Sequence, residues 1–522
     1  MSGNSRTKNT ARNLTVSFAA MLPTYLMQFV IRTIFVRILG RSYLGINGYF
    51  SSILTMLSLT ELGLDTAINF KLYKPLAERD VPRLRILMKF YRLAYLVVGT
   101  VILILGVCLI PFLPTLVKDY DAITELGVNG TAIFLLNLGS SVTSYWFFAS
   151  NSAIIKADQK NYIISITGVI TEFICAVVQV AVLLIWSNFT LYVTAAVFAK
   201  IIGNLINAVI ALRMYPDVFE KTDEHMDAAE IRGMFKDLGA IFFSKLNSVA
   251  IKATDNLVLG FFSGFDILGS YSNYLVIYGA ATSIPNKAYT AAKASMGNLF
   301  ASSDDLTKYR FFKVANYLII IIYGVFAVGV SVLADELITV WLGAEYVIPQ
   351  PFSLLVGLEI LFVGVINNLN QIRNVSGLFR QMWFRPAIGV VINLVVSVAL
   401  VQVWDIYGVL LGTIASYVFS NFLIDPPIIY RLAFHGLKPV SDYYIRNSIY
   451  FALLFAVGVL DRMICASFFA GHGWFSFGVH AIICGISVPA AFAVVFRKTE
   501  EFGYVYQAGL RVLRKKHVGK SE

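Results

Sequence analysis

The chain has 522 residues, of which 57% are apolar and 14% are charged, and its mean hydropathy is +0.71. Soluble domains carry about 25% charged residues, so these values exclude a soluble globular fold, intrinsic disorder and a coiled coil. The formal net charge of +11 does not indicate nucleic-acid binding, because basic residues of membrane proteins collect in cytoplasmic loops and set the topology.

Fourteen segments are long and apolar enough to cross a bilayer, for which a helix needs about 20 residues. Their apolar runs are continuous, whereas strands of a membrane barrel would alternate over about ten residues. We therefore predict an all-α polytopic membrane protein. The expected spans are 13–36, 45–70, 93–113, 126–149, 162–186, 190–212, 238–262, 267–286, 314–334, 351–372, 386–403, 407–430, 447–470 and 474–496.

The distribution of Lys and Arg predicts the orientation of these spans. With the N-terminus in the cytoplasm, 34 of the 42 basic residues fall on the cytoplasmic side. Only four, Arg37, Arg41, Lys118 and Arg462, fall on the external side. One missed helix would reverse this bias midway along the chain, so we expect an even number of spans and two cytoplasmic termini. The first span is preceded by basic residues and has no cleavage site, so we expect it to stay in the membrane.

A weak internal repeat relates the two halves of the chain. An offset of 224 residues gives eleven identities in about seventy positions, the clearest being Leu44 and Gly45 with Leu268 and Gly269. The repeat predicts two six-helix lobes of the same orientation, related by an axis along the membrane normal. The expected divisions are an N-terminal lobe at 1–213, a cytoplasmic linker at 214–237, a C-terminal lobe at 238–430, and two extra helices with a basic tail at 431–522.

Charged side chains inside the predicted spans are candidate binding residues, because a charge at mid-bilayer costs about 2.5–3.5 kcal/mol unless it faces water or a partner. Arg32, Lys245 and Lys252 would give a cationic cavity for an anionic headgroup, with Asp255 and Glu61 beside them. Arginine suits phosphate because its planar fork binds two oxygens. The alternative is structural ion pairing, of Lys252 with Asp255 or of Arg32 with Glu61.

Three further basic residues, Arg373, Arg380 and Arg385, follow the tenth span. They either reflect the charge bias of cytoplasmic loops or form a cytoplasmic mouth that captures a diphosphate. The four cysteines form no CxxC pair, the five histidines are scattered, and no GxxxxGK[ST] motif is present. We therefore expect no metal site, no cofactor and no enzymatic activity.

Three stretches, taken in order along the chain, resemble one known family. Residues 6–78, 254–274 (TDNLVLGFFSGFDILGSYSNY) and 373–416 are similar to the polysaccharide transporters and O-antigen-type flippases. That family belongs to the multidrug/oligosaccharidyl-lipid/polysaccharide exporter superfamily. The resemblance implies two six-helix lobes around a V-shaped cavity, alternating access, and a cavity lined by the first, second, seventh and eighth helices. Arg32, Lys252 and Asp255 lie on those helices.

The resemblance also implies the cargo. We expect a multi-pass protein of the prokaryotic plasma membrane that moves a polyprenyl-diphosphate-linked oligosaccharide from the inner to the outer leaflet for surface polysaccharide biosynthesis, driven by the membrane potential or an ion gradient. Expected partners are this glycan lipid, membrane lipids, a polysaccharide polymerase and glycosyltransferases. A lipid II flippase and a drug/cation antiporter of the same superfamily remain alternatives.

Overall fold

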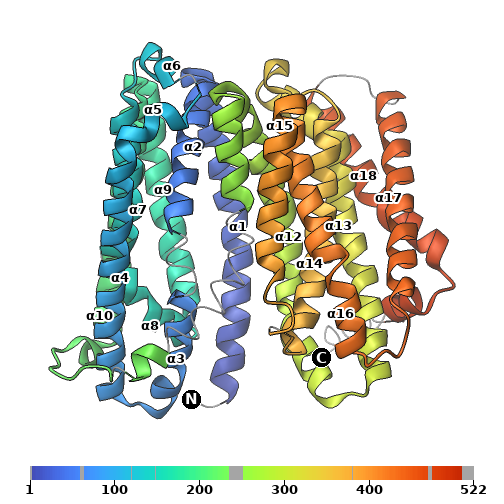
Figure 1. Cartoon of the computed structure of the whole chain (residues 1–522), viewed down its shortest axis with the longest axis horizontal. Helices are drawn as coiled ribbons and strands as arrows, with labels where there is room; N and C mark the ends of the chain where they lie inside the picture. The colour runs from blue at the N-terminus through green and yellow to red at the C-terminus, as the bar shows by residue number, and fades with distance from the viewer. Residues whose placement is uncertain are drawn as a thin grey trace, which may run out of the picture. The chain divides into compact units, whose positions relative to one another are not determined.

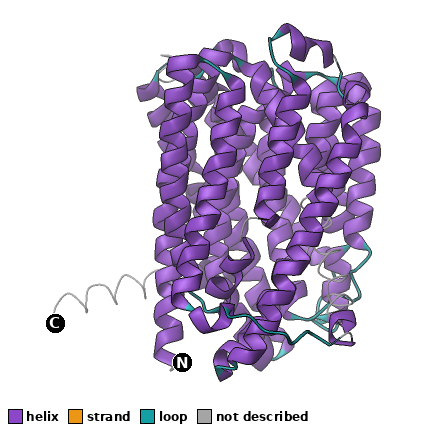
Figure 2. Ribbon diagram, turned by 90° about the vertical axis from the view of Figure 1, so that its left-hand side faces the viewer, coloured by secondary structure: helices purple, strands orange, loops and turns teal. Residues whose placement is uncertain are grey.

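A computed structural model describes residues 3–58, 64–118, 120–146, 149–227, 229–233, 251–378, 380–467 and 473–507. Within these ranges the regular secondary structure is entirely helical (Figure 2). The chain divides into two compact units, Met1–Ser272 and Asn273–Glu522. The all-α prediction is therefore confirmed for the described residues. Residues 251–272, which we assigned to the C-terminal lobe, belong to the first compact unit.

The first unit is built mainly of long, steeply inclined helices joined by short turns (Figure 1). The unlabelled helix 251–262 and the beginning of α12 complete it. Its labelled helices are α1 (Gly3–Leu39), α2 (Arg41–Leu57), α3 (Leu64–Glu78), α4 (Val81–Leu109), α5 (Leu113–Leu116), α6 (Tyr120–Glu125), α7 (Gly130–Trp146), α8 (Ser152–Ala157), α9 (Asn161–Trp186) and α10 (Phe189–Met214).

The second unit begins inside α12 and contains the remaining helices. Its helices are α12 (Phe265–Ser302), α13 (Asp305–Trp341), α14 (Phe352–Val375), α15 (Arg385–Tyr417), the π-helical turn η6 (Val418–Phe422), α16 (Asp425–Leu432), α17 (Ser441–Ser467) and α18 (Trp474–Phe496).

Nine helical segments of the described chain are long and apolar enough to span a membrane. Several agree closely with the predicted spans: 162–186 corresponds to α9, 190–212 to α10 and 474–496 to α18. Within the predicted span 45–70 the structure gives α2 as far as Leu57 and α3 from Leu64, and residues 59–63 lie outside the described residues. The total of fourteen spans stays a prediction.

One of these segments, α15, turns back on itself at Asp405, whose backbone is non-helical with φ 49° and ψ −131°. Side chains pair across the two arms: Asn393 Nδ2 donates to Thr413 Oγ1 at 2.9 Å, and Ser416 Oγ donates to the Gly389 carbonyl at 2.8 Å. Residues further before the turn pair with residues further after it, as expected for an antiparallel helical hairpin. The two arms therefore correspond to the predicted spans 386–403 and 407–430.

The outer faces of the long helices expose large apolar side chains. Phe475 is 77% exposed, Val403 73% and Val494 70%. Such surfaces are unfavourable in water but match the hydrocarbon core of a bilayer, which is as apolar as these side chains. Together with the nine candidate spans, they identify a membrane protein whose helices face lipid.

A buried ion pair fixes the beginnings of α15 and α16 to each other. Arg385 Nη1 donates to Asp425 Oδ2, and both side chains are at most 3% exposed. The other terminal nitrogen of Arg385 donates to Asn370 Oδ1 on α14 at 2.9 Å. A charge buried in this way is tolerated only while its partner and hydrogen bonds stay in place.

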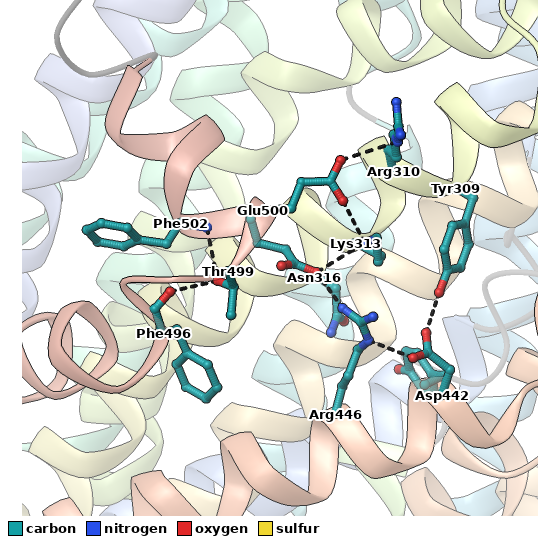
Figure 3. Close-up of polar contacts among 12 residues, drawn as sticks. Tyr309, Arg310, Lys313, Asn316, Asp442, Arg446, Phe496, Thr499, Glu500 and Phe502 are labelled. Carbon is teal, nitrogen blue, oxygen red and sulfur yellow. Dashed lines mark hydrogen bonds and ion pairs between the residues drawn. The ribbon is translucent and has the colours of Figure 1, made fainter.

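A second network ties α17 and the segment after α18 to α13 at the end predicted to be cytoplasmic (Figure 3). Lys313 Nζ lies 3.0 Å from Glu500 Oε2 and 3.4 Å from Glu501 Oε1, and Arg446 bonds to both Glu501 and Asp442. Lys313 holds the pKa of the Glu500 carboxyl below its usual range by donating a hydrogen bond to it. With Arg310, which pairs with Glu500 at 3.3 Å, three basic groups balance three acidic ones, so the network holds α17 and the segment after α18 against α13.

We predict that Asp425→Asn lowers stability by about 3–5 kcal/mol, because it leaves the Arg385 guanidinium buried without a counter-charge. The measurement is the thermal unfolding midpoint of the purified protein in detergent. Glu125→Gln, which removes an exposed carboxylate, is the control and should leave the midpoint unchanged. Equal midpoints for both variants would contradict a structural role for the pair.

Candidate functional site

Arg32, the first of the predicted cavity residues, lies on α1 about two turns before its end. It is partly buried, and its guanidinium donates to the Ser272 carbonyl at 2.7 Å and to Ser272 Oγ at 3.1 Å. Among the described residues no carboxylate forms an ion pair with Arg32. In this conformation its positive charge is therefore bound by neutral acceptors, and its role in binding an anion stays a prediction.

The helix 251–262 carries the next candidates. Asp255 is only 5% exposed, whereas Lys252, three residues earlier, is exposed. Asn256, on the same helix, donates to Ser52 Oγ of α2 at 2.9 Å. Lys245 and Glu61 lie outside the described residues, so their roles stay predictions, as do those of Lys252 and Asp255.

The repeat detected in the sequence has a direct structural counterpart. Gly40 and Gly264 are 224 residues apart, and both adopt positive φ, 91° and 84°, immediately before a helix begins. Glycine reaches this region without the steric cost that other residues incur. Both sequence halves therefore make the same sharp turn between consecutive helices, from α1 into α2 and from 251–262 into α12.

The two turns pack against each other through glycines on α2 and α12. A Cβ on Gly45 would lie 2.1 Å from the Phe265 carbonyl oxygen, and a Cβ on Gly269 would lie 2.0 Å from that of Arg41. The offset of 224 converts Arg41 into Phe265 and Gly45 into Gly269, so each contact is the repeat image of the other. This reciprocity is the signature of a local two-fold axis.

Two equivalent positions meet on that axis. Ser42 and Asp266 are 224 residues apart, and Ser42 Oγ donates to Asp266 Oδ1. Arg41 Nη2 lies 3.4 Å from Asp266 Oδ2, with both side chains well exposed. An exposed ion pair of this kind contributes little, at most about 1 kcal/mol, so the backbone packing at the glycines holds the crossing together.

The loop containing α5 and α6 covers the same end of the unit. Lys118 Nζ donates to the Phe262 carbonyl at 2.8 Å, and Tyr43 OH donates to the Leu126 carbonyl at 2.8 Å. Tyr49 OH also donates to the Leu116 carbonyl. In this conformation the ends of these helices that we predict to be external are packed together, and Arg32 lies about 10 Å deeper on α1.

The three arginines of the predicted cytoplasmic mouth lie in different environments. Arg380 is exposed, Arg373 is 7% exposed and hydrogen-bonds Asn374, and Arg385 is 3% exposed in its pair with Asp425. Arg373 interacts electrostatically with both Arg385 and Asp425. The structure thus brings Arg373 and Arg385 together, and the capture of a diphosphate by the three stays a prediction.

Sequence reasoning did not select Asn256 or Ser272, the polar residues by which the two sequence halves reach each other. The repeat could have indicated Asn256, since the offset of 224 makes it the equivalent of Arg32. No sequence signal indicates Ser272. Arg32 donates to its main-chain carbonyl, a group that every residue has.

Solved structures with the same fold are membrane transporters and flippases. The lipid II flippase MurJ in an inward closed conformation has a TM-score of 0.55 at 14% identity, over 92% of this chain and 99% of that one. An inward-facing multidrug resistance MATE family transporter of the MOP superfamily has a TM-score of 0.56 at 12% identity, over 82% and 100%. The eukaryotic MATE transporter AtDTX14 gives 0.53 at 14%, over 84% and 97%.

The fold is therefore the multi-helix membrane fold of MurJ and the MATE transporters. The family model for polysaccharide biosynthesis proteins matches residues 10–293, more than half of the chain. The chain belongs to this polysaccharide biosynthesis family. No curated protein matches it in sequence.

We predict that Gly45→Ala destabilises the protein by about 1–3 kcal/mol, the usual cost of adding a methyl group to a packed site. Gly48→Ala is the matched control on the same helix, because a Cβ there meets no atom within 4 Å. Thermal unfolding of both variants in detergent tests the prediction. If Gly45→Ala unfolds at the same temperature as Gly48→Ala, the two turns are not packed as described.

Proposed function

We propose that this protein is a flippase that moves a polyprenyl-diphosphate-linked oligosaccharide from the inner to the outer leaflet of a prokaryotic plasma membrane, for the synthesis of a surface polysaccharide. The family and the transporter fold support the class. The observation that supports an anionic substrate is the state of Arg32. Its guanidinium lies in a predicted membrane span and forms no ion pair with a carboxylate among the described residues. Glycosyltransferases and a polymerase would act before and after this step.

The geometry of Arg32 suggests how it would act. In the present conformation it binds the Ser272 carbonyl, which links α1 to α12. If the two turns separate during alternating access, the guanidinium loses this acceptor. The oxygens of a diphosphate would replace it and form two parallel charge-assisted hydrogen bonds. Cargo binding and the separation of α1 from α12 would then favour each other.

The other candidate residues extend this proposal. Lys245 and Lys252 are seven residues apart, so on the predicted seventh span they would share one face. They would add positive charge along the path of the diphosphate, with Asp255 and Glu61 moderating it. Arg373, Arg380 and Arg385 would attract the cargo at the cytoplasmic side.

A lipid II flippase is the second candidate. MurJ, a lipid II flippase by its description, matches 92% of this chain, a larger share than the 82% matched by the MATE transporter. The likeness concerns the fold, and a diphosphate would bind Arg32 equally in either cargo. Supplying lipid II or a polyprenyl-diphosphate oligosaccharide to the same reconstituted protein distinguishes the two. A drug/cation antiporter fits less well, because a cationic drug requires carboxylates rather than Arg32.

We predict that Arg32→Gln reduces translocation of the oligosaccharide lipid about 10- to 100-fold, since hydrogen bonds to a charged group contribute about 1.5–3 kcal/mol. Transport is measured in proteoliposomes as the fraction of fluorescent cargo that becomes accessible to an impermeant quencher. Arg37→Gln, an exposed arginine on the same helix, should transport normally.

Ser272→Ala separates cargo binding from a structural role of Arg32. It removes the hydroxyl acceptor but keeps the guanidinium and the carbonyl, so transport should remain within a few-fold of wild type. Transport by Arg32→Gln at the wild-type rate, in protein with an unchanged unfolding midpoint, would refute the proposed role of Arg32.

We further predict that an inside-negative potential accelerates export. A diphosphate carries about two negative charges, and each gains about 2.3 kcal/mol per 100 mV on moving outward. A potassium diffusion potential set by valinomycin in proteoliposomes provides the test. Rates that are independent of the potential would exclude this drive and direct attention to an ion gradient.

A further inference from the structure

In the second unit, α13 and α14 are packed so closely that glycines are required between them. A Cβ on Gly357 of α14 would lie 1.9 Å from Ser331 Oγ and 2.5 Å from the Ala327 carbonyl oxygen of α13. One Cβ on Gly364 would similarly meet the Tyr323 ring at 2.5 Å. Small residues allow membrane helices to approach in this way. These two helices form a continuous wall.

Helix α17 meets this wall at one level and separates from it at the next. A Cβ on Gly324 of α13 would lie 2.7 Å from Leu454 Cδ2, so the contact there is tight. One turn further along α17, a Cβ on Gly458 would find its nearest atom, Val328 Cγ1, only at 4.0 Å. The space between α17 and the wall therefore widens between Leu454 and Gly458.

A cavity of about 320 Å³ fills this space. Val328, Leu358, Phe455 and Gly458 are among its apolar lining residues, and Arg462 lies at one end. The hydroxyl of Ser331, also in the lining, donates to the Ala327 carbonyl at 2.7 Å and so offers little polarity. We name this space the α17 groove.

The α17 groove is about as long as one membrane leaflet is thick. Its lining on α17 runs from Phe451 to Arg462, which corresponds to about 16 Å at 1.5 Å per residue. Half of a hydrocarbon core is about 15 Å. Flanking side chains of α17 face outward, with Phe455 64% and Met463 63% exposed. The groove therefore opens toward the bilayer.

Arg462 gives the groove a polar end. Its side chain is exposed, and among the described residues no carboxylate forms an ion pair with it. It lies five residues before the end of α17, where a long basic side chain can reach the headgroup layer. A phosphate bound there would place an attached acyl chain alongside Gly458 and Phe455.

We propose that the α17 groove binds one acyl chain of an anionic bilayer phospholipid, with the lipid phosphate held by Arg462. The apolar lining fits the chain, the length of the groove matches that of the chain, and the arginine fits the phosphate. The site is separate from the cargo residues of the first unit and does not depend on the proposed function. A lipid in this position would act as a wedge between α17 and the wall of α13 and α14.

The test uses the full-length protein in nanodiscs with phosphatidylglycerol or phosphatidylcholine carrying a photoreactive diazirine on one acyl chain. After irradiation, the labelled peptides are identified and quantified. We expect labelling of α13, α14 and α17 around Val328, Leu358 and Gly458. Phosphatidylglycerol should label about five-fold more than phosphatidylcholine, as expected for about 1 kcal/mol from one basic residue near the membrane surface.

Two variants address the two halves of the site. Gly458→Leu fills the groove and should reduce labelling by both lipids at least five-fold. Arg462→Gln should abolish the preference for phosphatidylglycerol while chain labelling persists. Gly485→Leu, at a position with no atom within 4 Å of a Cβ, and Arg497→Gln, an exposed arginine beyond α18, are the matched controls. Unfolding midpoints of all four verify that they fold.

Three results would overturn the proposal. Equal labelling of wild type by the two lipids would remove the anionic preference. Unchanged labelling in Gly458→Leu would place the lipid elsewhere. Displacement of the label by an uncharged polyprenol, but not by unlabelled phosphatidylglycerol, would assign the groove to an isoprenoid chain. Because lipid labelling is read independently of transport, failure here leaves the proposed flippase activity untouched.

Discussion

The close crossing of α2 and α12 is the constraint on which the first unit depends. Two glycines, Gly45 and Gly269, bring each helix against a main-chain carbonyl of the other. Inside a membrane no hydrophobic force draws helices together, so such contacts rely on close packing and on hydrogen bonds between helices. The bonds from Arg32 to Ser272 and from Asn256 to Ser52 lie directly beneath this crossing. They can form only while the crossing holds the helices at this distance.

Two arginines inside predicted spans or at their ends, Arg385 and Arg32, lie in different electrostatic environments. Arg385 is sealed in an ion pair with Asp425 and has the character of a fixed structural element. Arg32 has five donor hydrogens, and among the described residues it bonds to the two oxygens of Ser272. The first arrangement stabilises one conformation, whereas the second leaves donor capacity that a ligand can use. The contrast explains why charge in a span is by itself an incomplete guide to function.

Hydropathy predicted the helix boundaries well where a turn interrupts an apolar run. The boundaries of α18 and the reversal at Asp405 both follow polar or glycine residues that end an apolar run. The end of α2 at Leu57 was not predicted, because apolar and polar residues alternate irregularly in the sequence that follows it. The repeat indicated that Gly45 and Gly269 are equivalent, but equivalence does not imply contact. Likewise, the partner of Arg385 depends on tertiary packing that a linear pattern does not contain.

The meeting of Ser42 with Asp266 has a consequence for how such a protein can arise. In an assembly of two identical chains, a residue on the two-fold axis faces its own copy. Two aspartates would repel each other there, and a serine–aspartate bond would be unattainable. Joining both halves in one polypeptide frees the two axial positions to diverge. A hydrogen-bond donor can then face an acceptor at a position where a homodimer could only bring two identical residues together.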